Sequence, residues 1–154
     1  MHNANCMNIR GYDYKTNEGF LDYEFYSEGP KGKIKKIVRY TPRNAGGVTY
    51  FNLGFGDWNK AKTKIDDLAI SNNEDKDRIL ATVAATVLEF TMHFPDVWVY
   101  AQGSTKGRTR LYQMGIAANW NMIEPILLVY GFSNGKWQPF RKAVNYDAFI
   151  TIRK

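Results

Sequence analysis

The sequence has a single cysteine, Cys6, among its 154 residues, so an internal disulfide is excluded. A lone thiol without a CxxC partner also supports neither a zinc site nor a redox pair. No apolar run approaches the roughly 18 residues that a membrane-spanning helix needs, and residues 1–8 lack the apolar centre of a signal peptide. These absences favour a cytoplasmic protein with no membrane partner.

Repeats, low-complexity tracts and linkers are also missing. Hydrophobic residues make up 44% of the chain and charged residues 23%, which is typical of a soluble globular domain. A chain of this length buries a core without help from a metal or a disulfide. We therefore expect one domain over residues 1–154, with residues 1–10 as a flexible terminus.

Alternating apolar and polar residues predict strands over residues 21–26, 34–40, 50–55 and 65–70. A turn is expected at residues 29–32, and Pro42 with the glycines at 46 and 47 marks the next break. Short connections between these strands indicate an antiparallel meander.

The second half of the chain alternates between helices and strands. A helix is predicted to start at residues 72–75, where asparagine caps it and acids suit its positive end, and to run to about Phe94. A strand buried on both faces (97–101) and a helix over residues 106–119 follow, the helix with Leu111, Met114 and Ala118 inward. Asn134-Gly135 predicts a hairpin, and residues 146–152 a further strand.

Without the further strand over residues 146–152, these elements predict an α+β fold with the order β-β-β-β-α-β-α-β-β. Its sheet is largely antiparallel, and two helices pack on one face.

Acidic residues are scarce in two segments. Residues 31–64 hold nine basic side chains against Asp57, a net charge of +8, and residues 97–123 hold three basic side chains and no acid. Such clusters attract phosphate backbones or acidic protein surfaces. We select six residues of the first segment as candidates for nucleic-acid binding: Lys31, Lys33, Lys35, Lys36, Arg39 and Arg43. The other interpretation is a strand edge that lysines keep soluble and unpaired.

The second segment contains a loop between a strand and a helix, where glycines, hydroxyl residues and cations gather. Free backbone amides at a helix start, with cations nearby, form an anion site. The candidate phosphate-binding residues are Gly103, Ser104, Thr105, Lys106, Arg108, Arg110 and Tyr112. The spacing matches neither a Walker A loop nor GxGxxG, so an ordinary capped turn whose arginines pair with acids stays open.

The sequence has few residues that could form a metal site or a catalytic site. A nucleotidyltransferase needs two metal-binding carboxylates after the loop, and residues 97–123 offer none. We interpret His93 as a structural residue at the end of a helix, and the acids of residues 66–77 as capping residues without a metal. We expect no cofactor, and no catalytic residue is assigned.

Aromatic residues are abundant, at 15% of the chain. Tyr26, Tyr40, Tyr50 and Trp58 lie near the basic strands, where they serve as a stacking platform for single-stranded nucleic acid or fill the sheet face against the helices.

Three blocks of residues carry a resemblance to a known group of proteins: residues 27–36, residues 80–84, and residues 100–105 with 108–112. The chain resembles an uncharacterised family of small bacterial single-domain proteins over nearly its whole length. That family has no assigned activity, so the resemblance implies a free-standing domain and transfers no catalytic residue.

The function best supported by the residues is a non-enzymatic domain that binds phosphate groups, with RNA or DNA as its expected partner. The second hypothesis is a protein-interaction module that meets an acidic partner, as in a toxin–antitoxin or phage-defence pair, or forms a homo-oligomer. A third is a metal-independent ribonuclease that uses Arg108, Arg110 and Tyr112. The separation of Arg110 from Tyr112 by two helical positions weakens the third.

Overall fold

The computed structural model describes residues 11–66 and 72–154, and these form a mixed sheet with three helices. The strands are β1 (Lys15–Thr16), β2 (Asp22–Gly29), β3 (Gly32–Ala45), β4 (Val48–Asn59), β5 (Lys64–Asp66), β6 (Trp98–Ala101), β7 (Leu127–Ser133), β8 (Lys136–Pro139) and β9 (Ala148–Arg153). The helices are α1 (Lys76–His93), α2 (Lys106–Ala118) and α3 (Trp120–Ile123).

The predicted α+β fold with a largely antiparallel sheet is confirmed. The strand order is β1-β2-β3-β4-β6-β9-β7-β8, and β5 pairs with β4 beside this path. All neighbours are antiparallel except β4 and β6, which run parallel. The expected final strand, β9, lies inside the sheet between β6 and β7, and it joins the two halves of the structure.

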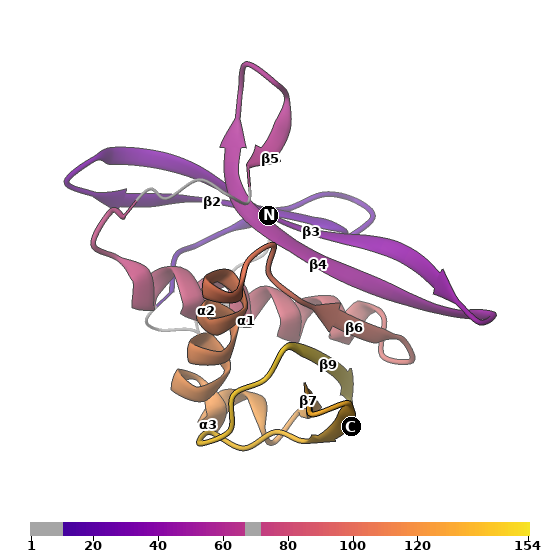
Figure 1. The fold of residues 1–154 in the computed structure, drawn as a ribbon. Helices are drawn as coiled ribbons and strands as arrows, with labels where there is room; N and C mark the ends of the chain where they lie inside the picture. Colours follow the sequence, from indigo (N-terminus) through magenta and orange to yellow (C-terminus); the bar gives the residue numbers. More distant parts are fainter. Residues whose placement is uncertain (1–10, 67–71) are drawn as a thin grey trace.

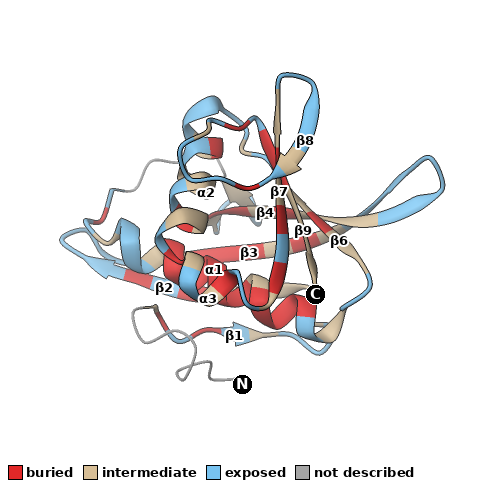
Figure 2. Ribbon diagram, turned by 90° about the horizontal axis from the view of Figure 1, so that it is seen from below, coloured by how far each residue is buried: buried red, intermediate tan, exposed pale blue. Residues whose placement is uncertain are grey.

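The sheet curls around α1. Figure 1 shows β2, β3 and β4 above this helix and β7 and β9 below it, and α2 and α3 lie on the same concave side. In Figure 2 the buried residues gather on α1 and on the parts of the strands that lie next to it. Every residue of α1 from Leu80 to Thr91 except Val87 is buried. The helix therefore needs partners for polar as well as apolar side chains.

Three polar side chains form a stripe on α1 and make hydrogen bonds with Tyr12 and Tyr14, which precede β1, and with Tyr40 of β3. Thr82 Oγ1 accepts the Tyr12 backbone N–H at 2.8 Å, and Glu89 Oε1 accepts the Tyr14 hydroxyl at 2.7 Å. Between them, Thr86 Oγ1 and the Tyr40 hydroxyl are 2.9 Å apart. Buried polar groups without such partners would cost roughly 1–3 kcal/mol each.

Two apolar clusters meet on α1. One contains Phe25, Val38 and Phe90 beneath β2, β3 and β4, and the other packs Leu88 against Val129 and their neighbours from β7, α3 and β9. Helix α2 closes the same core at Gly115, where an added Cβ would lie 3.3 Å from Leu80 Cβ. This close approach sets how deeply α2 sits against α1.

Two expectations about the strands are wrong. Pro42 lies inside β3, opposite Phe51, and does not end the strand. The β2 pairing of β3 ends at Arg39, so Pro42 stands in a segment of β3 with one free edge, where the missing N–H is tolerated. Strand β6 is buried on one face only: Val99 is in the core, whereas Trp98 and Tyr100 are half-buried on the opposite face.

Two expectations about the helices are also wrong. Asparagine does not cap α1: its N-cap residue is Asp75, which makes no side-chain capping hydrogen bond, and Asn73 instead binds the β2–β3 turn. On α2, Met114 and Ala118 are exposed and Leu111 is half-buried, whereas the helix buries Thr109 and Gly115. Gly115 faces inward because α2 packs closely on α1 at this position.

Some predictions concern residues 1–10 and 67–71, which lie outside the described residues. They include the flexible terminus, the interpretation of Cys6 as a lone thiol, and residues 67–70 of the strand expected over residues 65–70. Among the described helices, none is both long and apolar enough to cross a membrane.

The packing of β7 predicts the effect of one glycine substitution. A Cβ on Gly131 would lie 2.3 Å from Cδ1 of Tyr146, whereas a Cβ on Gly54 of β4 would lie 3.8 Å from its nearest neighbour, the Arg39 carbonyl oxygen. We expect Gly131→Ala to lower the free energy of unfolding by about 1–3 kcal/mol. Gly54→Ala, the matched control, should leave it unchanged or raise it slightly. Urea denaturation measures both, and equal stabilities would contradict the packing.

The buried tyrosines predict instability in alkali. Burial raises the pKa of Tyr14, Tyr23 and Tyr40 above the ordinary value of 10.0, and the Glu89 carboxylate raises the first two further. Above pH 10 the unfolded chain loses these protons while the folded chain keeps them. The free energy of unfolding should then fall by up to about 1.4 kcal/mol per pH unit for each tyrosine.

Tyr40→Phe tests this linkage, because it removes one of the protons. At pH 8 the variant should be about 1 kcal/mol less stable than the wild type, because it lacks the hydrogen bond to Thr86. Its stability should fall less steeply than that of the wild type between pH 10 and 11. Denaturant titrations at each pH give both values, and parallel pH profiles would disprove the account.

Candidate functional site

The predicted loop between β6 and α2 is held by its own side chains. Thr105 caps α2 and accepts the Arg108 backbone N–H at 3.2 Å. The Gly103 N–H donates to Thr109 Oγ1 at 3.0 Å, and that hydroxyl donates to the Thr105 carbonyl at 3.2 Å. Gly103 has no room for a side chain, since a Cβ would lie 2.4 Å from Arg108 Cβ. The expected capped loop is thus confirmed.

The cations of this loop point into two adjoining hollows. Arg108 and Tyr112, one helical turn apart, line a cleft of about 1040 Å³ together with Lys36 and Phe55, which we call the inner cleft. Lys106 and Arg110 line a second hollow of about 510 Å³, which we call the loop hollow. Its walls are Gln102, Gly103, Ser104, Thr105, Lys106, Gly107, Thr109, Arg110, Gln113, Asn145, Tyr146 and Asp147. Thr105 and Gly107 line both hollows, and the seven candidate residues divide between them.

The loop cations form no ion pairs with acids in residues 11–66 and 72–154. Arg108 donates to the Phe55 carbonyl at 3.4 Å, and its guanidinium lies 5.9 Å from the centre of the Phe55 ring. The other interpretation, a capped turn whose arginines pair with acids, therefore fails for the arginines in this part of the chain.

The basic strand β3 divides its cations between the two faces of the sheet. Lys33, Lys35, Arg39 and Arg43 alternate with core residues and point to the outer, convex face. Lys36 points inward, is 4% exposed and pairs with Asp57. Only Lys36 therefore joins Arg108 in the inner cleft.

Acids of β2 neutralise part of the basic strand. Arg39 binds Asp22 through two hydrogen bonds of 2.8 and 3.1 Å, and Lys35 lies 3.2 Å from Glu24. The described residues show no ion pair for Lys31, Lys33 or Arg43. The segment is less basic in space than its sequence indicates, because the neutralising acids come from the neighbouring strand.

The four aromatic candidates lie on both sides of the sheet. Tyr40 lies in the core, 1% exposed, and stacks on Phe90 with ring centres 4.1 Å apart. Tyr26, Tyr50 and Trp58 lie on the outer face. Lys35 stands between Tyr26 and Trp58 in register, with its Nζ 5.7 Å from the centre of the Trp58 ring.

A larger set of aromatic residues on the outer face was not among the candidates. We call it the outer aromatic patch, and it consists of Tyr50, Trp98, Tyr100, Tyr130, Phe132 and Trp137. Ring centres are 5.9 Å apart for Tyr50 and Tyr100, 6.4 Å for Tyr100 and Trp137, and 5.0 Å for Phe132 and Trp137. Trp98 contacts Tyr130 at 6.1 Å. The two-residue spacing of 98 with 100 and of 130 with 132 is the sequence signal that could have revealed it.

The outer aromatic patch continues into the loop hollow. The Tyr100 hydroxyl donates to Gln102 Oε1 at 2.8 Å, and Gln102 forms part of the hollow. Burial raises the pKa of Tyr100 above the ordinary value of 10.0. Aromatic rings and loop cations thus lie along one surface.

His93 makes structural contacts, as expected. Its ring stacks on Phe20 with centres 3.6 Å apart, and its Nε2 lies 3.4 Å from the Glu89 carboxylate. Among the described residues, no group of three His, Cys, Asp or Glu side chains is placed to hold a metal ion.

The fold and its surfaces define an α+β domain with an aromatic outer sheet face and two hollows beside one loop. Residues 8–154 match DUF6934, a family of unknown function, and the chain belongs to that family. No curated protein and no solved structure matches the chain. The expected membership in an uncharacterised family is confirmed.

The loop geometry predicts opposite effects for two glycines. Gly103→Ala should lower the free energy of unfolding by about 1–3 kcal/mol, because its Cβ would also lie 2.5 Å from the Thr109 backbone nitrogen. A Cβ on Gly107 would lie 3.8 Å from its nearest neighbour, so Gly107→Ala should stabilise α2 by up to about 1 kcal/mol. Thermal unfolding of both variants measures this, and a Gly103→Ala protein as stable as wild type would contradict the loop packing.

Proposed function

We propose that the outer sheet face binds single-stranded RNA or DNA. The observation that carries this proposal is the row of Tyr50, Tyr100 and Trp137 rings, which leads from Arg43 to the cations of the loop hollow. Unpaired bases stack on half-exposed aromatic rings while cations contact the phosphates between them. The proposed partner therefore needs bases that are free to leave a helix.

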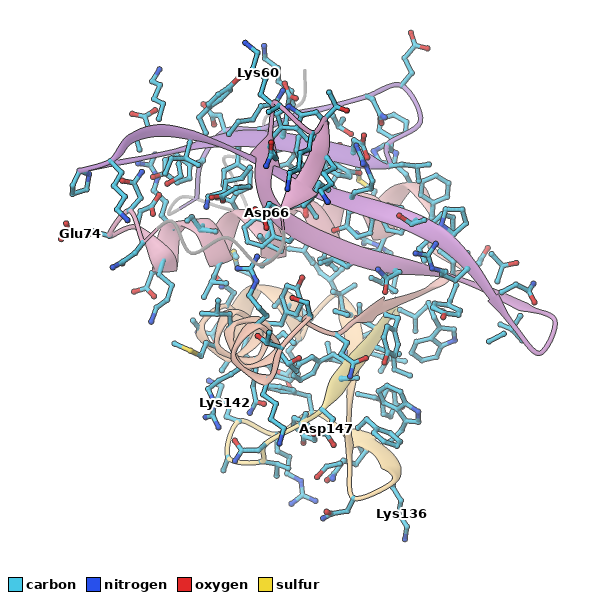
Figure 3. All side chains as sticks on the ribbon, turned by 45° about the horizontal axis from the view of Figure 1, so that its top comes forward. Lys60, Asp66, Glu74, Lys136, Lys142 and Asp147 are labelled. Atoms are coloured by element: carbon cyan, nitrogen blue, oxygen red, sulfur yellow. The ribbon has the colours of Figure 1, made fainter. Side chains whose placement is uncertain are left out.

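The charge around the outer aromatic patch favours a polyanion. Residues 96–147 contain six basic residues against Asp96, Glu124 and Asp147, a net charge of +3, and Asp147 lines the loop hollow with Lys106 and Arg110. Lys136 precedes Trp137 at the end of the β7–β8 hairpin, and Figure 3 shows its side chain pointing away from the molecule. In the loop hollow, Lys106 and Arg110 extend this positive surface beyond Tyr100.

A protein partner is the second candidate function, and one observation favours it. Leu128 and Trp137 are each 41% exposed on the outer face, and exposed apolar side chains of this size also suit a protein interface. The partner would be an acidic protein or a second copy of this chain. The ribonuclease hypothesis gains no support, because Arg110 and Tyr112 line different hollows. We propose a cytoplasmic binding domain and assign no catalytic residue.

Fluorescence anisotropy with labelled single-stranded 12-nucleotide RNA and DNA, and a duplex of equal length, tests the proposal. Trp137→Ala should weaken single-strand binding about 10-fold, since one stacked base contributes about 1–3 kcal/mol. Met92→Ala, which truncates another exposed apolar side chain, is the control and should change affinity less than twofold. Equal affinities of the two variants would contradict the proposal.

The dependence of binding affinity on salt concentration tests whether the loop cations contact phosphates. Arg110→Ala should weaken binding and reduce the slope of log affinity against log salt by about 0.7, the value for one phosphate contact on a single strand. Lys60→Ala is the control, because Figure 3 places Lys60 on the β4–β5 loop, far from the loop hollow. Native mass spectrometry separates the second candidate: a dimer that Trp137→Ala dissociates would favour self-association instead.

A further inference from the structure

A cavity lies inside the core, where the two apolar clusters meet on α1. Its surface is entirely apolar, and its volume is about 80 Å³. We call it the core cavity. Both clusters contribute to its walls, which include Leu53, Val83, Val99, Ala84, Leu127 and Val129. Protein cores contain few spaces larger than a water molecule, so a cavity of this size offers room for a ligand.

The walls decide what can occupy the core cavity. A buried water needs about two to four polar partners, and the surface of the cavity offers none. Apolar cavities of this kind stay dry and accept apolar molecules. About 10–15 Å³ of such space holds one water-sized group, so the core cavity holds roughly five methylene groups. The expected occupant is a short hydrocarbon chain.

The core cavity adjoins the inner cleft. Leu80 of α1 and Tyr112 of α2 line both spaces. Tyr112 is half-buried and packs against both apolar clusters, so its side chain stands at the boundary between the cleft and the cavity. A chain that lies in the cavity reaches the cleft by passing between these two side chains. A ligand that fills both spaces therefore has an apolar end and an end suited to the cleft.

The inner cleft offers a cation beside this boundary. Arg108 lies one helical turn before Tyr112 on the same face of α2. Its hydrogen bond to the Phe55 carbonyl is 3.4 Å long and therefore weak, and it has no ion pair within the described ranges. Its guanidinium can therefore receive a carboxylate through two parallel N–H donors.

The remaining charges of the inner cleft favour a ligand with a single negative charge. Acidic and basic side chains are equally frequent in its walls, which contain Glu28, Glu74, Asp75, Asp77, Lys36, Lys76, Arg78 and Arg108. A surface with balanced charge does not attract a polyanion, whereas one cation with free donors binds one carboxylate. The cleft and the cavity together thus suit a carboxylate with an apolar tail.

We propose that the inner cleft and the core cavity together bind an unbranched fatty acid of about eight carbons. Its carboxylate binds Arg108, its first carbons pass between Leu80 and Tyr112, and its methyl end fills the core cavity. Both spaces lie among α1, α2 and the concave side of the sheet (Figure 1). The outer aromatic patch lies on the convex side, so this proposal does not depend on the proposed function.

Isothermal titration calorimetry of the full chain with butanoate, hexanoate, octanoate and dodecanoate tests the size of the site. Affinity should rise about 4-fold for each carbon added up to octanoate, because each one buries another methylene group. Dodecanoate should bind no more tightly than octanoate, because the core cavity is then full. A continued rise to dodecanoate would indicate adsorption to an exposed apolar surface and would overturn the proposal, as would no octanoate binding at millimolar concentration.

The carboxylate contact is tested by removing either charge. Octan-1-ol should bind at least 10-fold more weakly than octanoate. Arg108→Ala should weaken octanoate binding at least 10-fold and leave octan-1-ol binding unchanged, whereas Lys142→Ala, an equal loss of charge outside both hollows, should change neither. If Arg108→Ala fails to fold, Arg108→Gln removes the charge and keeps most of the side chain, with the same expected result. Equal octanoate affinities of the Arg108 and Lys142 variants, or of octan-1-ol and octanoate, would contradict this contact.

Substitutions that fill the core cavity test the position of the chain. Ala84→Leu adds carbons from α1 and Ala101→Val adds them from β6, and both residues line the cavity. Each should weaken octanoate binding at least 10-fold. Ala118→Leu is the control, because Ala118 is exposed and lines neither the cavity nor the two hollows, and it should leave binding unchanged. Circular dichroism shows which variants fold, and undiminished octanoate binding by either folded cavity variant would refute the assignment.

The two proposals fail separately. Octanoate at a saturating concentration should leave the affinity for single-stranded 12-mers unchanged, because the outer aromatic patch lies on the opposite face of the sheet. Displacement of a bound 12-mer by octanoate would mean that the fatty acid binds the outer aromatic patch, and it would overturn the core cavity as the site.

Discussion

The burial of α1 on nearly all sides is the constraint on which the rest of the structure depends. A helix that rests on a flat sheet keeps a solvent face for its polar residues, but a helix inside a curled sheet does not. Thr82, Thr86 and Glu89 lie within the core and are satisfied by Tyr12, Tyr40 and Tyr14 from outside the helix. These three tyrosines are therefore as necessary to α1 as its own leucines and valines.

The position of α1 also separates the cations of α2. Gly115 brings α2 close to Leu80, so the face of α2 that carries Arg108 and Tyr112 turns toward the inner cleft. Arg110, two positions from each of them, turns toward the loop hollow. A run of basic residues that looks like one site in the sequence thus serves two surfaces, because a helix spreads alternate residues to different sides.

Local patterns predicted most of the elements, and long-range pairing accounts for what they missed. The β7–β8 hairpin was visible because Asn134 and Gly135 both adopt the positive φ that its turn requires. The parallel pairing of β4 with β6 was not visible in the sequence, because it joins residues that are far apart in the chain. The α1 pattern showed its apolar residues but not the buried Thr86, whose burial depends on a hydroxyl from β3.

The same distinction applies to the candidate site. The capped loop at Thr105 was predictable because every hydrogen bond in it is local. The neutralisation of Arg39 by Asp22 depends on strand register, and so does the grouping of Tyr50, Tyr100 and Trp137. Asp75 was interpreted as a helix cap, and its bonds to Tyr12 and Ser27 became visible only in three dimensions.

The place of β9 gives the chain a particular order of assembly. Among the described strands β9 is the last in sequence, yet it is the only link between the β7–β8 hairpin and β6. Until β9 pairs, β7 and β6 each have an unpaired edge. An incompletely folded chain therefore carries two additional open strand edges, which attract other chains, and β9 covers both when it inserts between them.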